Sequence, residues 1–194
     1  MPDLSDGLRF RRTSRDDLPQ IRRWLQLAHV ERYWAHDTSE VAVARDFAGS
    51  FEGTEPSEDF IIELDAEPIG FIQRCFIHDY PVEHSELIDL AVAPVRSLTI
   101  DYFIGEPDML GRGLATQSIR AFSTESFAAH SDAPAIIVPV ITGNTASWSA
   151  LASAGFRRIA TGYLTPDSPL DDGQHHVYRL DRPPLTPRCG SAER

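Results

Sequence analysis

A strand, a glycine-rich turn, a helix and a second strand, in that order, restrict the fold of this chain more than any other feature. Leu98 to Ile104 reads as a strand, residues 105–110 as a loop, residues 111 to about 129 as a helix, and Ala135 to Val140 as an almost continuous apolar strand. Two strands joined by a crossover helix are expected to lie parallel, with a right-handed connection. The pattern therefore predicts a sheet that is at least partly parallel and carries a helix on one face.

Five more strands and three more helices are predicted around this unit. The strands are expected at residues 8–12, 60–64, 68–77, 156–163 and 176–180, and the helices after Thr13 or Ser14, after Thr38, and over 144–154. Residues 78–97 mix His, Asp and Glu with short apolar patches and are predicted to be irregular, with at most one short strand. This order predicts an α/β (α+β) domain with a mixed central sheet of about six to seven strands and helices on both faces.

Helical spacing predicts which faces of the first two helices are buried. The first is expected to bury Leu18, Ile21, Leu25 and Ala28, and the second Val41, Ala44, Phe47 and Phe51. We expect one domain over residues 1–182 and a flexible Pro-rich polar tail over 183–194.

Composition excludes several classes of protein. The net charge of −11 argues against nucleic-acid binding and favours cationic small molecules as partners. No apolar run is long enough to cross a membrane, and nothing near the N-terminus reads as a signal peptide. The two cysteines, Cys75 and Cys189, do not suggest a disulfide framework, so a cytoplasmic location is expected.

The glycine-rich turn Gly111-Arg112-Gly113-Leu114-Ala115-Thr116 is suited to binding a phosphate. A helix that begins here presents backbone N–H groups and the positive end of its dipole, and glycine lets the backbone approach an anion closely. Arg112 adds a positive charge and Thr116 a hydroxyl. There is no Lys for a P-loop, and Thr116 stands where a dinucleotide-binding fingerprint needs a third glycine. A turn that merely starts a helix is the competing interpretation.

Two further motifs add a resemblance to a known family. Asn144-Thr145-Ala146-Ser147 begins the next helix, and Ala154-Gly155-Phe156 ends it. With the glycine-rich turn, which departs from the family pattern only at Leu110, the chain resembles the GCN5-related N-acetyltransferase (GNAT) superfamily. The resemblance implies acetyl-coenzyme A as the cofactor. It places the cofactor on Phe103, Ile104, Gly105, Gly111, Arg112, Gly113, Leu114, Ala115, Thr116, Asn144 and Ser147.

Pro139 agrees with this resemblance. A proline cannot donate to a sheet ladder, so it is unexpected in a fully paired central strand. In the GNAT superfamily the two parallel strands splay apart, and such a strand tolerates a proline at its unpaired edge. A simple bulge would also accommodate Pro139.

The acceptor side resembles the aminoglycoside 6′-N-acetyltransferases. The shared elements are His29-Val30-Glu31-Arg32-Tyr33-Trp34 after the first helix and Ile100-Asp101 in the strand before the turn. The resemblance implies that Asp101 contacts the substrate amine and acts as the base, and that the acceptor is a cationic amine such as an aminoglycoside. The expected substrate-binding residues are Tyr33, Trp34, Glu83, Glu86, Asp89 and Asp101. Tyr33 and Trp34 could equally be core residues. The three acidic residues from 83 to 89 could equally belong to a solvated loop.

The chain departs from these enzymes at two positions. Leu151 stands seven residues after Asn144, where superfamily members often have a Tyr that acts as general acid. No second aspartate lies near Pro139, where some aminoglycoside enzymes carry one. A lysine or hydroxylysine N-acyltransferase of siderophore synthesis, and a catalytically silent domain that binds coenzyme A, therefore stay open as alternatives.

The remaining expectations concern the reaction and other ligands. A backbone N–H near Ile104 or Gly105 is expected to stabilise the oxyanion. No metal site is expected, because His78 and His84 lack ligand spacing and His175-His176 reads as an exposed strand start. The chain is expected to be a monomer or a homodimer.

Overall fold

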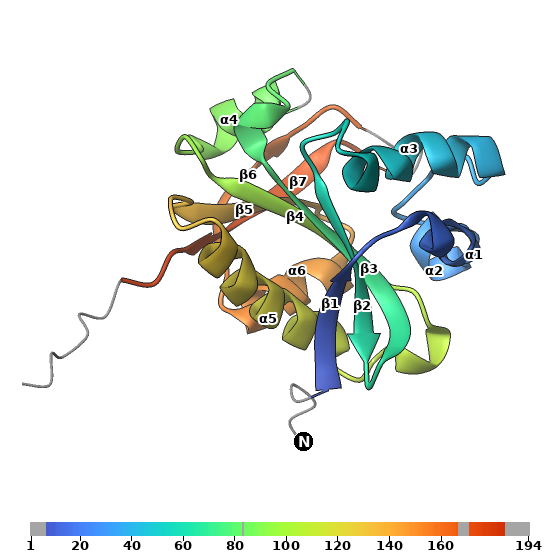
Figure 1. The fold of residues 1–194 in the computed structure, drawn as a ribbon. Helices are drawn as coiled ribbons and strands as arrows, with labels where there is room; N and C mark the ends of the chain where they lie inside the picture. Colours follow the sequence, from blue (N-terminus) through green and yellow to red (C-terminus); the bar gives the residue numbers. More distant parts are fainter. Residues whose placement is uncertain (1–6, 83, 167–170, 185–194) are drawn as a thin grey trace, which may run out of the picture.

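One mixed sheet with helices against both faces organises the computed structural model (Figure 1). The structure describes residues 7–82, 84–166 and 171–184. Most of the predicted tail at 183–194, and Glu83, lie outside the described residues. The seven strands appear in the order β1-β2-β3-β4-β5-β7-β6 across the sheet. All seven predicted strands are present, which confirms the predicted fold class.

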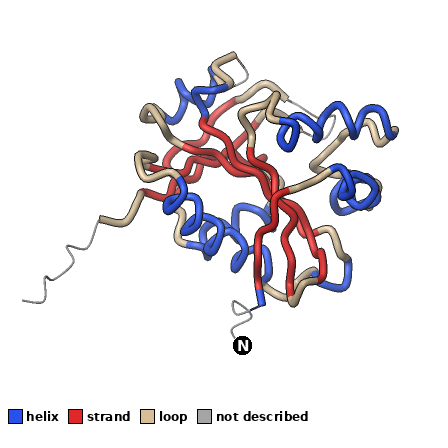
Figure 2. The backbone as a smooth tube through the Cα atoms, viewed as in Figure 1, coloured by secondary structure: helices blue, strands red, loops and turns tan. Residues whose placement is uncertain are grey.

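The elements follow the predicted order with additional short helices (Figure 2). The strands are β1 (Leu8–Arg12), β2 (Glu58–Leu64), β3 (Glu67–Phe76), β4 (Leu98–Ile104), β5 (Ala135–Ile141), β6 (Arg157–Tyr163) and β7 (Gln174–Asp181). The α-helices are α1 (Leu18–Leu25), α2 (Ala28–Glu31), α3 (Glu40–Glu52), α4 (Ser85–Ala91), α5 (Leu114–Ala129) and α6 (Thr145–Ala154). The short 3₁₀ helices are η2 (Arg15–Asp17), η3 (Ile77–Asp79) and η4 (Pro107–Met109).

The parallel pair β4 and β5 divides the sheet into two halves. Strands β1 to β4 form an antiparallel ladder, and β5, β7 and β6 form another. Between the two halves, Leu98 and Ile136 are the one pair in register among the described residues. The halves therefore meet near the start of β4 and part beyond it, as the resemblance implied.

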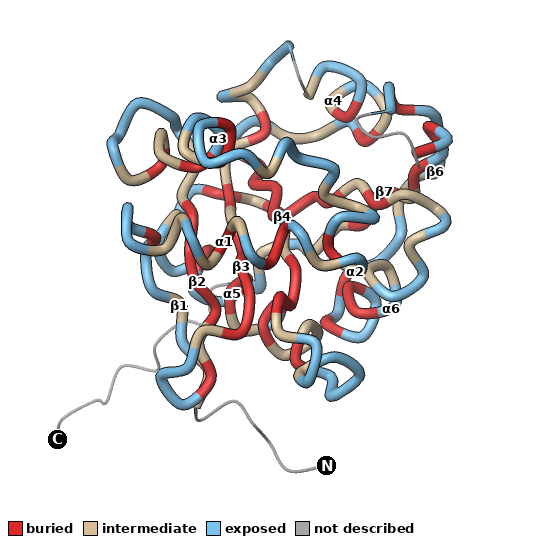
Figure 3. Tube along the Cα trace, turned by 90° about the vertical axis from the view of Figure 1, so that its right-hand side faces the viewer, coloured by how far each residue is buried: buried red, intermediate tan, exposed pale blue. Residues whose placement is uncertain are grey.

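The two faces of the sheet bury different cores (Figure 3). On one face α5 and α6 pack Ile119, Phe122 and Leu151 against the strands. On the other face α1, α2 and α3 enclose an aromatic cluster that includes Trp24 and Phe71. Because both faces are covered, the central strands are nearly all apolar, as expected for a buried sheet.

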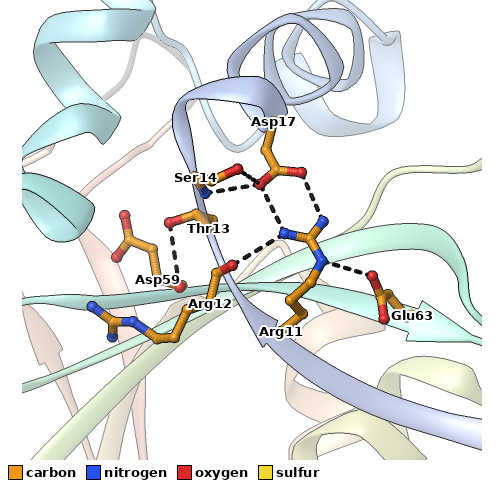
Figure 4. A network of polar contacts seen from close by, with 7 residues as sticks. All are labelled: Arg11, Arg12, Thr13, Ser14, Asp17, Asp59 and Glu63. Atoms are coloured by element: carbon orange, nitrogen blue, oxygen red, sulfur yellow. Dashed lines mark hydrogen bonds and ion pairs between the residues drawn. The ribbon is translucent and has the colours of Figure 1, made fainter.

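A polar network joins the first strand to the first helix (Figure 4). Arg11 on β1 donates to Glu63 Oε1 at 2.8 Å and to both oxygens of Asp17, at 2.9 and 2.7 Å. Asp17 accepts from the Ser14 backbone N–H at 2.8 Å, which completes a capping box. Asp59 beside this network is buried, and burial raises its pKa to about 6. The network fixes the direction in which α1 leaves the sheet.

Helix positions account for most differences between prediction and structure. Helix α3 is capped by Ser39, whose side chain accepts from the Ala42 N–H, and not by Thr38. Phe47 is buried as predicted, and Val43, one turn before it, is buried with it. Val41, predicted to be buried, lies in the first turn of α3 and is 81% exposed. Ser14 caps the 3₁₀ turn η2, so α1 itself begins only at Leu18.

Two other predicted segments are corrected. The described residues of the segment 78–97 form the helix α4 and no strand, because Leu87 and Ala91, one turn apart, pack on Ile137 and Val177. Helix α5 begins at Leu114, not Gly111, since Gly113 has φ +77° and ends the turn in the left-handed region.

Gly105 is packed directly against the indole ring of Trp24. A Cβ at Gly105 would lie 2.4 Å from that ring, which is fully buried. Trp24 Nε1 also donates to Glu106 Oε1 at 2.8 Å, and Arg23 pairs with the same carboxylate. This contact fastens α1 to the loop that leads into the glycine-rich turn.

We expect Gly105→Ala to destabilise the fold. The added methyl cannot fit without moving Trp24, so the free energy of unfolding should fall by about 1–3 kcal/mol and Tm by several degrees. Gly143→Ala is the matched control, because a Cβ there meets nothing within 4 Å. Thermal unfolding followed by circular dichroism checks both variants. Equal melting temperatures would show that Trp24 does not hold this loop.

Candidate active site

Two adjoining cavities lie where β4 and β5 part. The wide cavity, of about 530 Å³, is lined by α2, the end of β4, the glycine-rich turn and the start of α6. The narrow cavity, of about 160 Å³, is lined by β4, β5, α6 and His175. Both are lined by Tyr33, Trp34, Tyr102, Asn144 and Ser147. Together they form one cleft through the split in the sheet.

Backbone groups of β4 face this split. At the two ends of the β3–β4 ladder, Gly105 N–H donates to Ile69 O at 2.8 Å and Ile77 N–H donates to Ser97 O at 3.0 Å. In an antiparallel pair the residues alternate in direction, so odd-numbered residues from 97 to 105 face β3. Tyr102 and Ile104 therefore direct their N–H groups toward β5, beyond the one pair in register. Of the two residues expected to offer a donor to an oxyanion, Ile104 fits and Gly105 does not.

Pro139 faces the same split from the other side. Thr142 N–H donates to Gln174 O at 2.8 Å, and Arg182 N–H donates to Pro134 O at 2.9 Å. The even-numbered residues of β5 therefore face β7. Pro139, which has no N–H, points toward β4, where no ladder bond is lost. This explains how a proline is tolerated in a central strand.

The glycine-rich turn leaves the start of α5 open. Gly111 and Gly113 have φ of +70° and +77°, and a Cβ on Gly111 would meet nothing within 4 Å. No side chain caps α5 among the described residues, whereas Asn144 caps α6 by accepting from Ser147 N–H at 3.1 Å. The first N–H groups of α5 and the exposed Arg112 are thus presented together. Of this turn, Gly111 and Ala115 line the wide cavity.

Asp101 lies in the narrow cavity on the face opposite Tyr102. Gln73, its partner across β3 and β4, donates from Nε2 to Asp101 Oδ2 at 3.3 Å. The cavity wall beside Asp101 is formed by Val138, Pro139, Val140 and Ile141. Asp101 is the one carboxylate that lines this cavity.

The aromatic pair after the first helix forms a wall of the cleft. Trp34 packs edge-on against Phe103 and Phe71, with ring centroids 5.0 and 5.7 Å apart. It is therefore a partly buried core residue whose remaining surface lines the cleft, and Tyr33 lies beside it. Trp34 is therefore a core residue, as one interpretation expected, and it also has surface in the cleft, as the substrate-binding interpretation requires. Phe103 itself is buried and lines the wide cavity.

Sequence reasoning did not identify three polar residues of the cleft. His29 Nε2 donates to Ile104 O at 3.0 Å and joins α2 to the split. The Tyr102 hydroxyl lies 2.8 Å from Ser147 Oγ and 3.3 Å from Ser147 O. His175, expected to be exposed, is buried and lines the narrow cavity. Leu151, which stands where relatives often have a Tyr, is fully buried in the core. A tyrosine in an alternating strand gives no signal that separates a cleft residue from a core residue.

The acidic residues of α4 do not line the cleft. Glu86 accepts from the backbone N–H and hydroxyl of Thr165, and the first of these contacts holds its pKa below its usual range. Asp89 is exposed on the same helix. Neither belongs to the residues that line the two cavities. The structure thus brings together Tyr33, Trp34 and Asp101 of the predicted acceptor residues, but not Glu86 or Asp89.

Two general features of the described residues bear on other ligand classes. In the part of the chain that the structure describes, no group of His, Cys, Asp and Glu side chains is arranged to hold a metal ion. Over the same residues, no helix combines the length and apolar character that a membrane span requires.

Known proteins share both the sequence pattern and the fold. Aminoglycoside N(6′)-acetyltransferases type 1 of Klebsiella pneumoniae and of Serratia marcescens are each 25% identical over 169 residues, which cover 85% of this chain and 81% of theirs. The crystal structure of an aminoglycoside acetyltransferase with coenzyme A and kanamycin aligns with a TM-score of 0.77 at 22% identity, covering 90% of this chain and 95% of that one.

The same fold also occurs with a different acceptor. An acetyltransferase of Salmonella typhimurium that modifies the N-terminal serine of ribosomal protein L7/L12 aligns with a TM-score of 0.71 at 15% identity, covering 93% of this chain and 98% of that one. The fold alone therefore does not select the acceptor. A family model described as the acetyltransferase (GNAT) domain matches residues 13–164, which is most of the chain. The protein therefore belongs to the GNAT family and is an N-acetyltransferase that uses acetyl-coenzyme A.

Proposed function

We propose that this enzyme acetylates a primary amine of a cationic small molecule, namely the 6′-amino group of an aminoglycoside. The observation that carries the proposal is the position of Asp101 at the split between β4 and β5, in the narrow cavity, beside the wide cavity that reaches the glycine-rich turn. The similarity to aminoglycoside N(6′)-acetyltransferases at 25% identity supports this class of acceptor.

The residues of the cleft fit acetyl-coenzyme A. Phosphates would lie at the open start of α5, against Gly111 and Gly113, with Arg112 as the neighbouring cation. The wide cavity leads from this turn to the split, which gives an extended chain a path between the strands. When bound, the cofactor supplies an acetyl thioester at that position.

The chain's own residues then move the protons and hold the charge. An alkylammonium, with a pKa of about 10, must lose a proton before it can attack. Asp101 holds the ammonium group and accepts that proton, directly or through water. The N–H of Ile104 faces the split and stabilises the negative charge that develops on the carbonyl oxygen. His29, which holds the Ile104 carbonyl, keeps this part of the strand in place.

A lysine-type amine is the second candidate. It is favoured by the small volume of the narrow cavity, about 160 Å³, and by its single carboxylate. An aminoglycoside carries several ammonium groups, and the carboxylates of Glu86 and Asp89 lie outside the lining of the cleft. The attraction for a polycation must therefore come from the net charge of the whole chain, which is −11.

A screen of acceptors tests the proposed function. Purified enzyme with acetyl-coenzyme A should release free thiol with aminoglycosides faster than with polyamines, lysine or hydroxylysine. The acceptor KM should rise with ionic strength, because salt screens the attraction between a polycation and an acidic protein. A lysine derivative that outperforms every aminoglycoside, with no salt effect on KM, would favour the second candidate. Coenzyme A binding without thiol release for any amine would indicate a silent domain.

We expect Gly113→Glu to weaken binding of acetyl-coenzyme A by about tenfold or more. The variant places a side chain and a negative charge where a phosphate should lie, and strains a backbone with φ +77°. Gly53→Glu is the matched control, since Gly53 has φ +72°, open space around it and a place at the end of α3. Isothermal titration calorimetry measures both affinities. If Gly113→Glu bound acetyl-coenzyme A with unchanged affinity, the phosphates could not lie at this turn.

Asp101→Asn is expected to lower kcat/KM for the amine by about 10²–10⁴-fold. Asparagine keeps the shape of the side chain but neither accepts the proton nor carries charge. Melting temperature and acetyl-coenzyme A affinity should stay close to those of the wild type. Asp132→Asn, at an exposed ion pair with Arg96, controls for the loss of one surface charge. A stable variant with full activity would exclude Asp101 as the base, and a loss confined to KM would make it an anchor for the ammonium.

A further inference from the structure

We propose that the Tyr102 hydroxyl donates the proton that the coenzyme A sulfur needs as it leaves, with Ser147 as its hydrogen-bonding partner. This inference rests on the proposed acetyl transfer, and it assigns a residue to the half of the reaction that Asp101 does not serve.

Tyr102 and Asp101 are neighbours on β4, so their side chains leave opposite faces of the strand. Asp101 lies on the face shared with Phe103, which packs on Trp34. Tyr102 lies on the face of α5 and α6, and its hydroxyl reaches the first turn of α6. Tyr102 lines both cavities, whereas Asp101 lines the narrow one. A thioester held in the split therefore has a carboxylate on the amine side and a phenol on the other side.

The hydrogen bonds of Tyr102 suit a proton donor. Its hydroxyl lies 2.8 Å from Ser147 Oγ, and the backbone carbonyl of Ser147 lies 3.3 Å away. The serine hydroxyl has a proton to give to the phenol oxygen, while the longer contact to the carbonyl is easily exchanged for a sulfur atom. Burial, reinforced by the nearby Asp101 charge, holds the pKa of Tyr102 above its usual value, so the phenol is protonated in the resting enzyme but is a weaker acid than a free tyrosine. The hydrogen bond with Ser147 acts in the opposite direction and favours release of the proton.

Other positions for this donor are filled by groups that have no suitable proton. Leu151 on α6 is fully buried and apolar. Trp148 uses its Nε1–H to donate to Thr142 O at 3.2 Å. Asn144 holds Ser147 N–H with its side-chain oxygen. Tyr102, in contrast, combines a transferable hydroxyl proton with a place on the wall of both cavities.

The proton balance of the step is complete. The amine nitrogen forms a bond to the carbonyl carbon, and Asp101 or water takes the proton that the nitrogen loses. The bond from that carbon to sulfur breaks, and its electron pair takes the proton of the Tyr102 hydroxyl. Ser147 passes a proton to the phenolate and recovers one from water in the cleft, and the proton that then leaves Asp101 neutralises the remaining hydroxide. The products are the N-acetyl amine and the thiol of coenzyme A.

A binding experiment tests whether the hydroxyl meets the sulfur. Calorimetry gives the affinity of coenzyme A and of desulfo-coenzyme A, which lacks the thiol, for the wild type and for Tyr102→Phe. Loss of one hydrogen bond predicts that the wild type prefers the thiol by about 2- to 10-fold and that Tyr102→Phe loses this preference. Tyr163→Phe, which removes an exposed hydroxyl on β6, should retain it. An equal preference in all three proteins would overturn the contact.

A kinetic experiment tests whether the hydroxyl gives a proton. In single turnovers with acetyl-coenzyme A, Tyr102→Phe should be about 10- to 100-fold slower than the wild type. With acetyl-seleno-coenzyme A the deficit should largely disappear, because a selenolate is a far weaker base and leaves without a proton. A deficit of equal size for both donors would make Tyr102 a positioning residue and overturn the proposal.

Failure of this inference is distinguishable from failure of the proposed function. If the wild type releases thiol with an amine and Tyr102→Phe is equally fast, Tyr102 is not the donor and the transfer still stands. If the wild type releases no thiol with any amine, the proposed transfer fails and the role of Tyr102 fails with it. The melting temperature of Tyr102→Phe is measured alongside, and a folded variant is expected since one hydroxyl is removed from a ring that keeps its apolar contacts.

Discussion

The parting of β4 from β5 is the constraint on which the rest of this site depends. Leu98 and Ile136 pair, and beyond them the two strands no longer share a ladder. The central strands of a sheet normally satisfy each other's backbone groups. Here the N–H groups of Tyr102 and Ile104 face the split. On the opposite strand, β5, the residue that faces the split is Pro139, which has no N–H. A ligand that enters the split can therefore add hydrogen bonds to β4 without displacing any ladder bond.

Most of the fold was predictable because apolar alternation and turn residues mark the strands. The buried faces of helices were less predictable: in α3 the apolar spacing placed both Val41 and Phe47 on the buried face, but Val41 lies in the first turn and is exposed. Helix α4 was missed because it is short: its apolar residues Leu87, Ile88, Leu90 and Ala91 make up barely two turns and are interrupted by Asp89. The role of Glu86 had no local signal at all, since its partner Thr165 lies 79 residues away in sequence.

The candidate site was predictable on the cofactor side and less so on the acceptor side. Helix starts and glycine turns are local, so the residues from Gly111 to Thr116 suggest an anion site, with a turn that merely starts a helix as the alternative. The narrow cavity is assembled from the residues that follow α2 and from β4, β5, α6 and β7, and these segments meet only through the topology of the sheet. His175 illustrates this, because it is a polar residue at the start of β7 and is nevertheless buried beside β5.

The charge distribution reconciles an acidic protein with an anionic cofactor. Many arginines are held in ion pairs, such as Arg74 with Glu58, Arg96 with Asp132 and Arg157 with Asp181. The wide cavity, the proposed cofactor site, instead has the open start of α5 with Arg112 near it and Arg32 in its lining. Such a field is local, because charges separated by more than about 10 Å are screened at ordinary ionic strength. The acidic remainder of the surface is then free to attract cations to the same cleft from the opposite side of the strand.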